Sequence, residues 1–253
     1  MSTLMWIFIL VVVLFWVPVM AIIFALTAPF DPGRYIAGRW FRLAAVTVVR
    51  VNPRWHFRTS GVRIADPRRP YVVVANHESY ADIFLLSTLP WEMKWLSKAQ
   101  IVRLPMMGWM MQMVGDIAVQ RDSRESRAAS IEAVRDRLRK NVSVMIMPEG
   151  TRSRTEDMLP FRDGAFRIAI EMGLPILPIA IAGTRNAMAA DSFIFNHATA
   201  EARVLEPVDT AGMTVADELT LKEEVRERIR VARDQLRIEV AERVSPSASA
   251  TRL

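Results

Sequence analysis

A histidine and an aspartate five positions apart, His77 and Asp82, lie where a predicted strand runs into a predicted helix. The strand is expected over residues 71–75, whose Tyr and Val side chains suit burial, and residues 83–86 continue as the apolar face of the helix. Ligands bind at the carboxyl ends of strands in open α/β sheets. Histidine titrates near neutral pH and suits proton abstraction, and a carboxylate on its other ring nitrogen would fix the tautomer. The pair is therefore a candidate general base with its orienting partner.

A purely structural interpretation of the same stretch is also open. Ser79 and Asp82 have the spacing of a helix capping box ahead of an apolar run, so both could serve only to start the helix. A lone histidine near an aspartate is more often structural than catalytic. The rest of the chain favours catalysis.

A second polar cluster follows the strand expected over residues 143–147. It contains Glu149, Gly150, Thr151 and Arg152. Glycine lets the backbone approach a ligand, and the planar guanidinium of arginine matches phosphate. The alternative is an ordinary polar turn with solvated arginines.

A further arginine, Arg121, stands just past the strand expected over residues 116–120. Alone it is a weak signal. If its strand and the strand before the second cluster are neighbours in the sheet, Arg121 and Arg152 would converge beside His77. The two guanidiniums would then form a phosphate site next to the candidate base.

Composition limits the classes of protein to which the chain can belong. Its 253 residues are enough for one α/β domain with an appendage. It has no cysteine and only three histidines, so disulfides, a Cys nucleophile and a His-rich metal site are not expected. The net charge of +6 suits phosphate or an anionic membrane surface. No zinc-finger spacing, RNA-recognition signature or dense basic block indicates a nucleic-acid partner.

The first part of the chain predicts membrane association. Residues 4–26 carry no charge and are long enough to cross a hydrocarbon core of roughly 30 Å. Residues 34–51 mix apolar side chains with arginines and could lie in the headgroup plane. A span and a hairpin that dips into one leaflet both fit. A cleaved signal peptide is less favoured because no Lys or Arg precedes the stretch, and a buried helix of a soluble protein is the other alternative.

Strands and helices alternate through the rest of the chain, which predicts an α/β fold with a mixed sheet flanked by helices. The expected organisation is a membrane anchor over 1–54, an α/β domain over 55–243 and a disordered tail over 244–253. A long helix expected over 217–240 carries many arginines and is interpreted as a solvated charged face, with membrane contact also open. The positive-inside rule places the domain on the cytoplasmic side of the cytoplasmic (inner) membrane.

A methionine-rich stretch, residues 105–113, holds five of the chain's 15 methionines. Methionine is flexible and fills irregular apolar space, so the stretch could line an acyl-chain groove. Ordinary core packing is an equally good interpretation.

The polar clusters, in this order, resemble the motifs of the 1-acylglycerol-3-phosphate acyltransferases (lysophosphatidate acyltransferases) and the wider glycerolipid acyltransferase family. The first motif of that family is Asn-His with an Asp five positions after the His, and Asn76, His77 and Asp82 match it. The second is a Gly with an Arg a few residues on, as at Gly115 and Arg121.

Two further motifs of the family are also present. Residues 147–153, Met-Pro-Glu-Gly-Thr-Arg-Ser, match a motif that has Phe in place of Met, and the change keeps an apolar side chain. Pro178 within an apolar strand matches the fourth motif. The resemblance covers roughly residues 71–183, and its first and third motifs are the specific ones.

The resemblance implies a reaction as well as a fold. His77 would be the general base and Asp82 would orient it. The acceptor hydroxyl would attack the thioester of acyl-CoA or acyl-carrier protein directly, so no covalent acyl-enzyme, cofactor or metal is implied.

The resemblance also implies how substrate is held. Arg121 and Arg152 would hold the acceptor's phosphate. Glu149, Gly150 and Thr151 are the other substrate-binding positions, and the first two would help to place the glycerol. The implied partners are membrane lipids, lysophosphatidic acid and the thioester donor.

The expected function is acylation of the sn-2 hydroxyl of 1-acylglycerol-3-phosphate to phosphatidic acid, a step of phospholipid biosynthesis. Three alternatives stay open. The same chemistry could act on glycerol-3-phosphate, another lysophospholipid or an amino-acid lipid. The chain could be a non-catalytic membrane-anchored lipid-binding protein, and a hydrolase is the weakest alternative.

Overall fold

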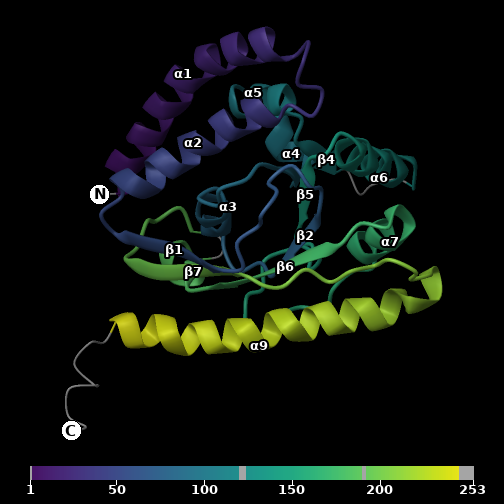
Figure 1. Ribbon diagram of the computed structural model, residues 1–253. Helices are drawn as coiled ribbons and strands as arrows, with labels where there is room; N and C mark the ends of the chain where they lie inside the picture. Colours follow the sequence, from purple (N-terminus) through teal and green to yellow (C-terminus); the bar gives the residue numbers. More distant parts are fainter. Residues whose placement is uncertain (1, 120–123, 190–191, 245–253) are drawn as a thin grey trace, which may run out of the picture.

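The computed structural model describes residues 2–119, 124–189 and 192–244, and these form a seven-stranded mixed sheet with helices on both faces (Figure 1). The sheet order is β1-β7-β6-β2-β5-β3-β4. The strands are β1 (Trp55–Gly61), β2 (Val72–Ala75), β3 (Met93–Lys98), β4 (Ile117–Val119), β5 (Ser143–Ile146), β6 (Ile176–Ala182) and β7 (Ala198–Val204). Among the described strands, every neighbouring pair is parallel except β6 and β7. The predicted mixed α/β sheet is confirmed.

The helices cover the two faces of the sheet in separate groups (Figure 1). They are α1 (Ser2–Thr27), α2 (Tyr35–Val51), α3 (Ala81–Leu86), α4 (Ala99–Val102), α5 (Met107–Val114), α6 (Arg124–Arg139), α7 (Gly164–Met172), α8 (Thr184–Ala187) and α9 (Glu218–Val244), with a 3-10 turn at Val215–Asp217. Residues of α6, α7 and α9 share one core cluster on one face. On the other face lies α3, with α1 and α2 stacked beyond it.

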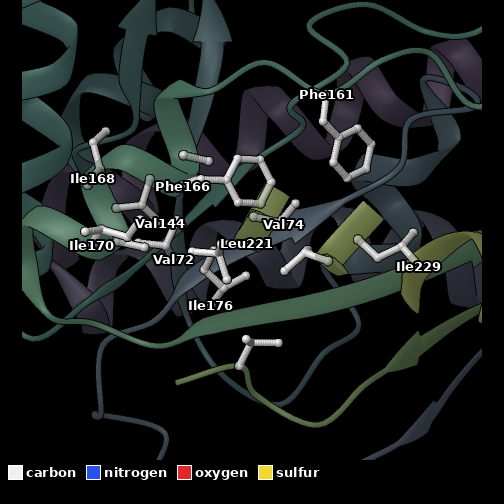
Figure 2. Close-up of a cluster of buried hydrophobic side chains, with 14 of the residues drawn as sticks. Val72, Val74, Val144, Phe161, Phe166, Ile168, Ile170, Ile176, Leu221 and Ile229 are labelled. Atoms are coloured by element: carbon white, nitrogen blue, oxygen red, sulfur yellow. The ribbon is translucent and has the colours of Figure 1, made fainter. Parts of the chain in front are cut away.

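Strand β2 shows how the sequence separates these two layers. All four of its residues are buried, and side chains alternate along a strand, so Val72 and Val74 point into one layer while Val73 and Ala75 point into the other. Figure 2 shows the first layer, where Phe166 of α7 packs over the valines. A strand buried on both faces is typical of the parallel centre of an α/β sheet.

The N-terminal helices α1 and α2 pack against each other and against α5. Met20, Ala37, Met110 and Val114 form the buried centre of this contact. The methionine-rich stretch therefore contributes core packing between the helical pair and the domain. Within the described residues, α1 is the one helix long and apolar enough to cross a membrane. Only 11% of the residues in its apolar stretch are buried.

Buried charges join α2 to the sheet. Arg42 donates to both carboxylate oxygens of Asp116, over 3.1 and 2.6 Å, and Lys94 donates to Glu92 over 3.0 Å. Burial raises the pKa of Glu92 and lowers that of Lys94, in each case opposed by the charge of the partner. Gly38 permits this approach, because a Cβ there would lie 2.0 Å from a Glu92 carboxylate oxygen. The helical pair is thus fixed to the domain by ion pairs shielded from water.

The condition for convergence of Arg121 and Arg152, that the strands before them are neighbours in the sheet, is not met. Strand β3 lies between β4 and β5, because β3 pairs with β5 on one side and β4 on the other. Adjacent strands therefore do not bring Arg121 and Arg152 together, and Arg121 lies outside the described residues. Residues 245–253 of the expected tail also lie outside them.

Candidate active site

The two polar clusters meet at one edge of the sheet. Strands β2, β5 and β6 run parallel and side by side, so their carboxyl ends lie together. His77 follows β2, Glu149 follows β5 and Thr184 follows β6. This is the edge at which open α/β sheets bind ligands.

The Asp82 carboxylate makes four close polar contacts within the site. Its Oδ2 atom lies 2.7 Å from Nδ1 of His77 and also accepts the backbone N–H groups of Glu78 and Ser79, over 2.8 and 3.0 Å. Its Oδ1 atom accepts the Thr184 hydroxyl over 2.5 Å. The side chain is fully buried. Asp82 therefore fixes the start of α3, in the manner of one half of a capping box, and orients His77 at the same time.

These contacts also favour one tautomer of His77. Two backbone N–H groups already donate to Oδ2 of Asp82, so this oxygen is an acceptor and Nδ1 of His77 is placed to donate to it as well. The lone pair then belongs to Nε2, for which the described residues provide no hydrogen-bond partner. The side chain is 17% exposed. An Nε2 lone pair open to an incoming group is what a general base requires.

Asn76 fixes the chain just before His77. Its side-chain amide donates to the carbonyl of Ile181 over 2.9 Å and accepts the Ile181 N–H over 2.8 Å. The amide thereby extends the ladder between β2 and β6 by one residue, at a point where the backbone of β2 has turned away. The buried amide sets the direction in which His77 leaves the strand.

Glu149 and Ser153 hold the backbone of His77 from the other side. The Glu149 carboxylate accepts the N–H groups of His77 and Leu159, each over 2.8 Å, and the Ser153 N–H donates to the His77 carbonyl over 3.0 Å. Burial raises the pKa of Glu149, opposed by the two backbone bonds. Both peptide groups of His77 are thus tied to the loop after β5.

The remaining residues of the second cluster surround this loop. Gly150 has a φ of +72°, a conformation that favours glycine, and its N–H closes a turn onto the Met147 carbonyl over 3.0 Å. Thr151 is exposed. The Arg152 guanidinium carbon lies 3.8 Å from the ring centroid of Tyr80, which stacks it against the segment that carries His77. The structure therefore brings Glu149, Gly150 and Arg152 beside the His77 segment.

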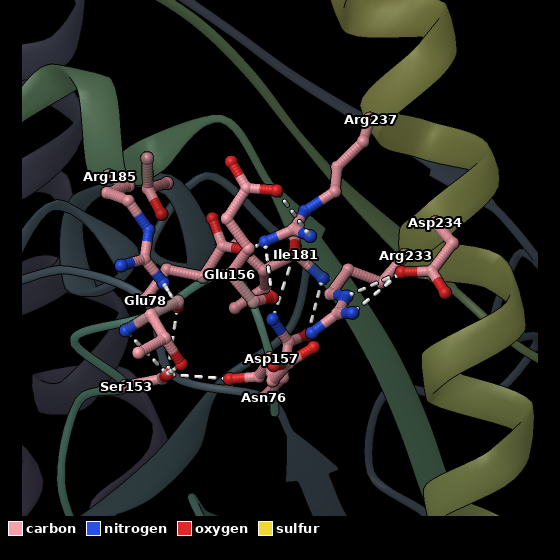
Figure 3. A network of polar contacts seen from close by, with 12 residues as sticks. Asn76, Glu78, Ser153, Glu156, Asp157, Ile181, Arg185, Arg233, Asp234 and Arg237 are labelled. Atoms are coloured by element: carbon pink, nitrogen blue, oxygen red, sulfur yellow. Dashed lines mark hydrogen bonds and ion pairs between the residues drawn. The ribbon is translucent and has the colours of Figure 1, made fainter. Parts of the chain in front are cut away.

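A further polar network on the side of α9 involves the residue after the histidine (Figure 3). Arg237 of α9 approaches Glu78 at 3.5 Å and donates to the carbonyl of Glu156 over 2.8 Å. Arg185 of α8 donates to the carbonyl of Thr155. Burial and the charge of Asp82 raise the pKa of Glu78 to about 7, against the lowering effect of the arginines.

The sequence interpretation missed part of this network. It treated the arginines of α9 as a solvated face, whereas Arg233 is only 5% exposed and Arg237 faces the site. Arg233 follows Ile229 by four positions and precedes Leu236 by three, so the helical period already places it in the apolar stripe. Thr184 had a signal as well, because it follows a strand that ends at the same sheet edge.

The chemistry available at this edge is proton transfer beside a cationic side chain. Within the described part of the chain, no group of three or more His, Asp or Glu side chains is placed to hold a metal ion. Glu149 and Ser153 hold the backbone of His77, and the N–H groups of Glu78 and Ser79 hold the carboxylate of Asp82. An anionic substrate near Arg152 would lie next to the His77 segment.

Comparison with known proteins identifies relatives that share this region. The family model described as Acyltransferase matches residues 56–182, which include His77, Asp82 and the loop after β5. A yeast (Saccharomyces cerevisiae) 1-acyl-sn-glycerol-3-phosphate acyltransferase is 30% identical over 173 residues, 67% of this chain and 55% of the relative. Human 1-acyl-sn-glycerol-3-phosphate acyltransferase beta is 34% identical over 162 residues, 61% of this chain and 58% of the relative. The chain thus spans a little over half the length of these two relatives.

A solved structure extends the likeness of fold to nearly the whole chain. The crystal structure of the 1-acyl-sn-glycerophosphate (LPA) acyltransferase PlsC from Thermotoga maritima superposes with a TM-score of 0.75 at 23% identity. The match covers 93% of this chain and 94% of that protein. A match of this extent reaches beyond the α/β domain into the N-terminal helical region.

Proposed function

Because the chain belongs to the acyltransferase family, we propose that it transfers an acyl group from acyl-CoA or acyl-carrier protein to the sn-2 hydroxyl of 1-acylglycerol-3-phosphate, producing phosphatidic acid. The observation that carries the proposal is the 2.7 Å contact between Nδ1 of His77 and the buried carboxylate of Asp82. It leaves Nε2 as a base at the sheet edge. The names of the relatives support the choice of reaction.

The proposed reaction needs one proton carrier. Nε2 of His77 takes the proton of the acceptor hydroxyl as its oxygen attacks the thioester carbonyl carbon. A C–O bond forms and the C–S bond breaks. The thiolate leaves and takes the proton back from His77. Asp82 stabilises the imidazolium in between, and its bonds to Glu78, Ser79 and Thr184 keep it from moving as charge develops.

We assign phosphate binding to Arg152, because its guanidinium is stacked on Tyr80 beside the His77 segment. A phosphate held there would place the neighbouring glycerol hydroxyl near the base, which contributes through positioning. Arg121 stays a proposed second phosphate ligand, and Gly150 and Thr151 stay proposed substrate contacts. For Glu149 we infer a positioning role through the backbone of His77, since both of its oxygens accept main-chain N–H groups.

We further propose that α1 lies along the membrane interface and does not cross it. The first turns and the middle of α1 are bonded to the rest of the protein: Trp6 donates to the carbonyl of Phe193 over 2.8 Å, and Trp16 donates to that of Trp40 over 2.8 Å. A helix held along its length in this way presents one apolar side to lipid.

We also propose that the domain faces the cytoplasm, the side on which the thioester donors are found. The positive-inside rule supports this orientation less strongly than the sequence suggested. Three of the arginines that it counts, Arg39, Arg42 and Arg54, form hydrogen bonds within the protein.

The purified full-length protein in detergent or vesicles tests the proposal directly. It is given labelled acyl-CoA or acyl-carrier protein with a panel of acceptors: lysophosphatidic acid, glycerol-3-phosphate, a neutral monoacylglycerol and water alone. Phosphatidic acid is the expected product. Transfer to glycerol-3-phosphate alone, or release of free fatty acid alone, would replace the lysophosphatidate assignment with one of its alternatives.

A further inference from the structure

The loop before β7 exposes two adjacent large apolar side chains on a rigid base. Phe193 is 66% exposed and Ile194 is 56% exposed, while Phe195 is buried. The ring of Phe195 lies 5.2 Å from that of Trp6 and 5.1 Å from that of Trp55. Rings packed in this way hold the loop, so the exposure of its tip is a fixed feature.

Hydrogen bonds attach the same loop to the first turns of α1. Trp6 donates to the carbonyl of Phe193 over 2.8 Å, and the N–H of Phe195 donates to the Ser2 hydroxyl over 3.1 Å. Arg54 donates to the carbonyl of Phe195 over 2.9 Å. The polar groups of the loop thus turn inward, and its apolar tip faces away.

The tip continues the apolar outer side of α1. The exposed side chains there are Leu4, Ile7, Leu10, Val11, Leu14 and Phe15, each at least 49% exposed. Residues 4–26 contain no charge, and residues 192–198 contain none of Asp, Glu, Lys or Arg. A surface this apolar and free of acidic and basic side chains fits acyl chains, and a polar Asn196–His197 border fits the headgroup region.

We propose that the tip formed by Phe193 and Ile194 (the 193–194 tip) is a second bilayer contact, inserted beside the N-terminal turns of α1. This inference rests on the membrane association in the proposed function. It adds a site of insertion outside the N-terminal helices, on the α/β domain itself.

The place of the tip ties it to the active site. Met5, Phe8 and Ile9 of α1 belong to the same apolar cluster as Tyr80 and Ala81, which start the helix after His77. The base, the Tyr80 platform of Arg152 and the 193–194 tip are thus carried by one packed unit. Insertion of the tip would hold this end of the domain against the headgroups, where the phosphate of a lipid acceptor lies.

The absence of cysteine from the chain allows a direct depth measurement. The full chain carrying Ile194→Cys is labelled with a nitroxide and bound to vesicles of phosphatidylcholine and phosphatidylglycerol. Its collision rates with oxygen, which concentrates in lipid, and with a water-soluble nickel chelate are compared. Ile238→Cys is the matched control, because Ile238 is 63% exposed on α9, across the sheet from α1 (Figure 1).

The expected result is that the label at 194 is protected from nickel and accessible to oxygen, while the label at 238 shows the reverse. Equal access of both labels to nickel would overturn the proposal. Immobilisation of the 194 label without vesicles, together with dimer formation, would overturn it in favour of a second copy of the chain. These outcomes do not depend on catalysis, so they remain interpretable if the proposed reaction is wrong.

A kinetic arm tests the consequence for the site. Phe193→Ser with Ile194→Ser should lower acyl transfer to lysophosphatidate embedded in vesicles roughly tenfold, the effect of losing part of two apolar side chains from lipid. Transfer to a short-chain acceptor in solution should stay unchanged. Val231→Ser with Ile238→Ser on α9 is the control and should change neither. An equal loss with both acceptors, or no loss with either, would contradict the proposal.

Discussion

Arg237 on helix α9 forms an ion pair with Glu78, with 3.5 Å between Nη2 and Oε1. Glu78 directly follows His77, the candidate base. The same guanidinium donates to the carbonyl of Glu156 in the loop after β5. One side chain, 159 positions along the chain from Glu78, therefore bridges the two segments that form the site (Figure 3). Helix α9 is therefore part of the support of the candidate active site.

Glu78 should give the protein a pH-dependent stability. Its pKa is raised from 4.5 to about 7, first by burial and then by Asp82. The folded state thus binds this proton more tightly than the unfolded chain. The stabilisation is complete below pH 4.5 and is lost as the pH rises through about 7, and it amounts to about 3 kcal/mol.

The replacement Glu78→Gln removes this titration. Between pH 5 and pH 8 the free energy of unfolding should then fall by about 2.5 kcal/mol less than it does in the unmodified protein. Urea unfolding of the full chain in detergent measures the difference. Glu156→Gln is the control, because Glu156 also faces Arg237 but its side chain is 90% exposed. Identical pH profiles for Glu78→Gln and the unmodified protein would show that Glu78 titrates normally.

Removal of the base should nearly abolish the reaction. His77→Ala is expected to lower kcat by about 10²–10⁴-fold, the usual contribution of general acid–base catalysis. The fold should survive, because the backbone bonds from Glu149 and Ser153 do not involve the imidazole. Thermal unfolding is measured alongside turnover. A folded His77→Ala protein with normal turnover would exclude His77 as the base.

Thr184 offers a finer test of how Asp82 works. Thr184→Val keeps the shape of the side chain but leaves Oδ1 of the fully buried Asp82 without its hydroxyl donor. We expect kcat to fall roughly tenfold with little change in KM, since a lost bond to a charged group costs about 1.5–3 kcal/mol. Thr184→Ser keeps the hydroxyl and should restore most of the rate. A Thr184→Val protein with unchanged kcat would show that this hydrogen bond does not contribute to the rate.

The His77–Asp82 contact and the order of the elements could be predicted from the sequence because both are local. A Val-rich strand, a turn and an apolar helix predict that His77 and Asp82 lie close together, and this prediction needs no knowledge of the rest of the fold. The sheet order could not be predicted in the same way. The position of β3 between β4 and β5 depends on pairing between strands that are distant in sequence. A different strand order would leave the local sequence pattern of each strand unchanged.

The predicted helix α9 and its buried apolar residues are confirmed, but the interpretation of its arginines was incomplete for a different reason. Its many arginines suggested a solvated face, since a charged side chain is rarely buried without a partner. The partners of Arg237, which are Glu78 and the carbonyl of Glu156, lie far from it in sequence, so no local pattern predicts these contacts. Only the position of Arg233 within the apolar stripe indicated that this face turns inward.

The buried ion pairs between α2 and the sheet should be costly to break. Lys94→Met removes the closest cation from Glu92. Among the described residues, Arg42 at 3.6 Å is then the only ion-pair partner of that carboxylate. An uncompensated buried charge of this kind costs about 3–5 kcal/mol. The control is Lys140→Met, which removes a partly exposed i,i+4 pair with Asp136 and should cost less than about 1 kcal/mol. Equal losses for the two variants would mean that Glu92 is neutral or hydrated in the folded protein.

The assignment of the acceptor depends most on Arg152. If its guanidinium holds the phosphate, Arg152→Ala should raise the KM for lysophosphatidic acid about 10- to 100-fold, because charge-assisted bonds contribute about 1.5–3 kcal/mol each. The KM for acyl-CoA should change little. Arg152→Lys should recover only part of the loss, since an ammonium lacks the planar fork. A neutral monoacylglycerol should be a poor acceptor throughout and should lose little more in the Arg152→Ala variant.

Tyr80 separates phosphate binding from support of the loop. Its ring lies 3.8 Å from the Arg152 guanidinium carbon, so Tyr80→Phe, which keeps an aromatic face, should be almost neutral. Tyr80→Leu removes the face and should raise the KM for lysophosphatidic acid in the same direction as Arg152→Ala, though by less. In the double variant Arg152→Ala with Tyr80→Leu, the second change should add almost nothing, because Tyr80 acts on phosphate only through Arg152. Equal losses with charged and neutral acceptors would instead make Arg152 a support of the loop or of the donor, and phosphate recognition would have to come from another cation.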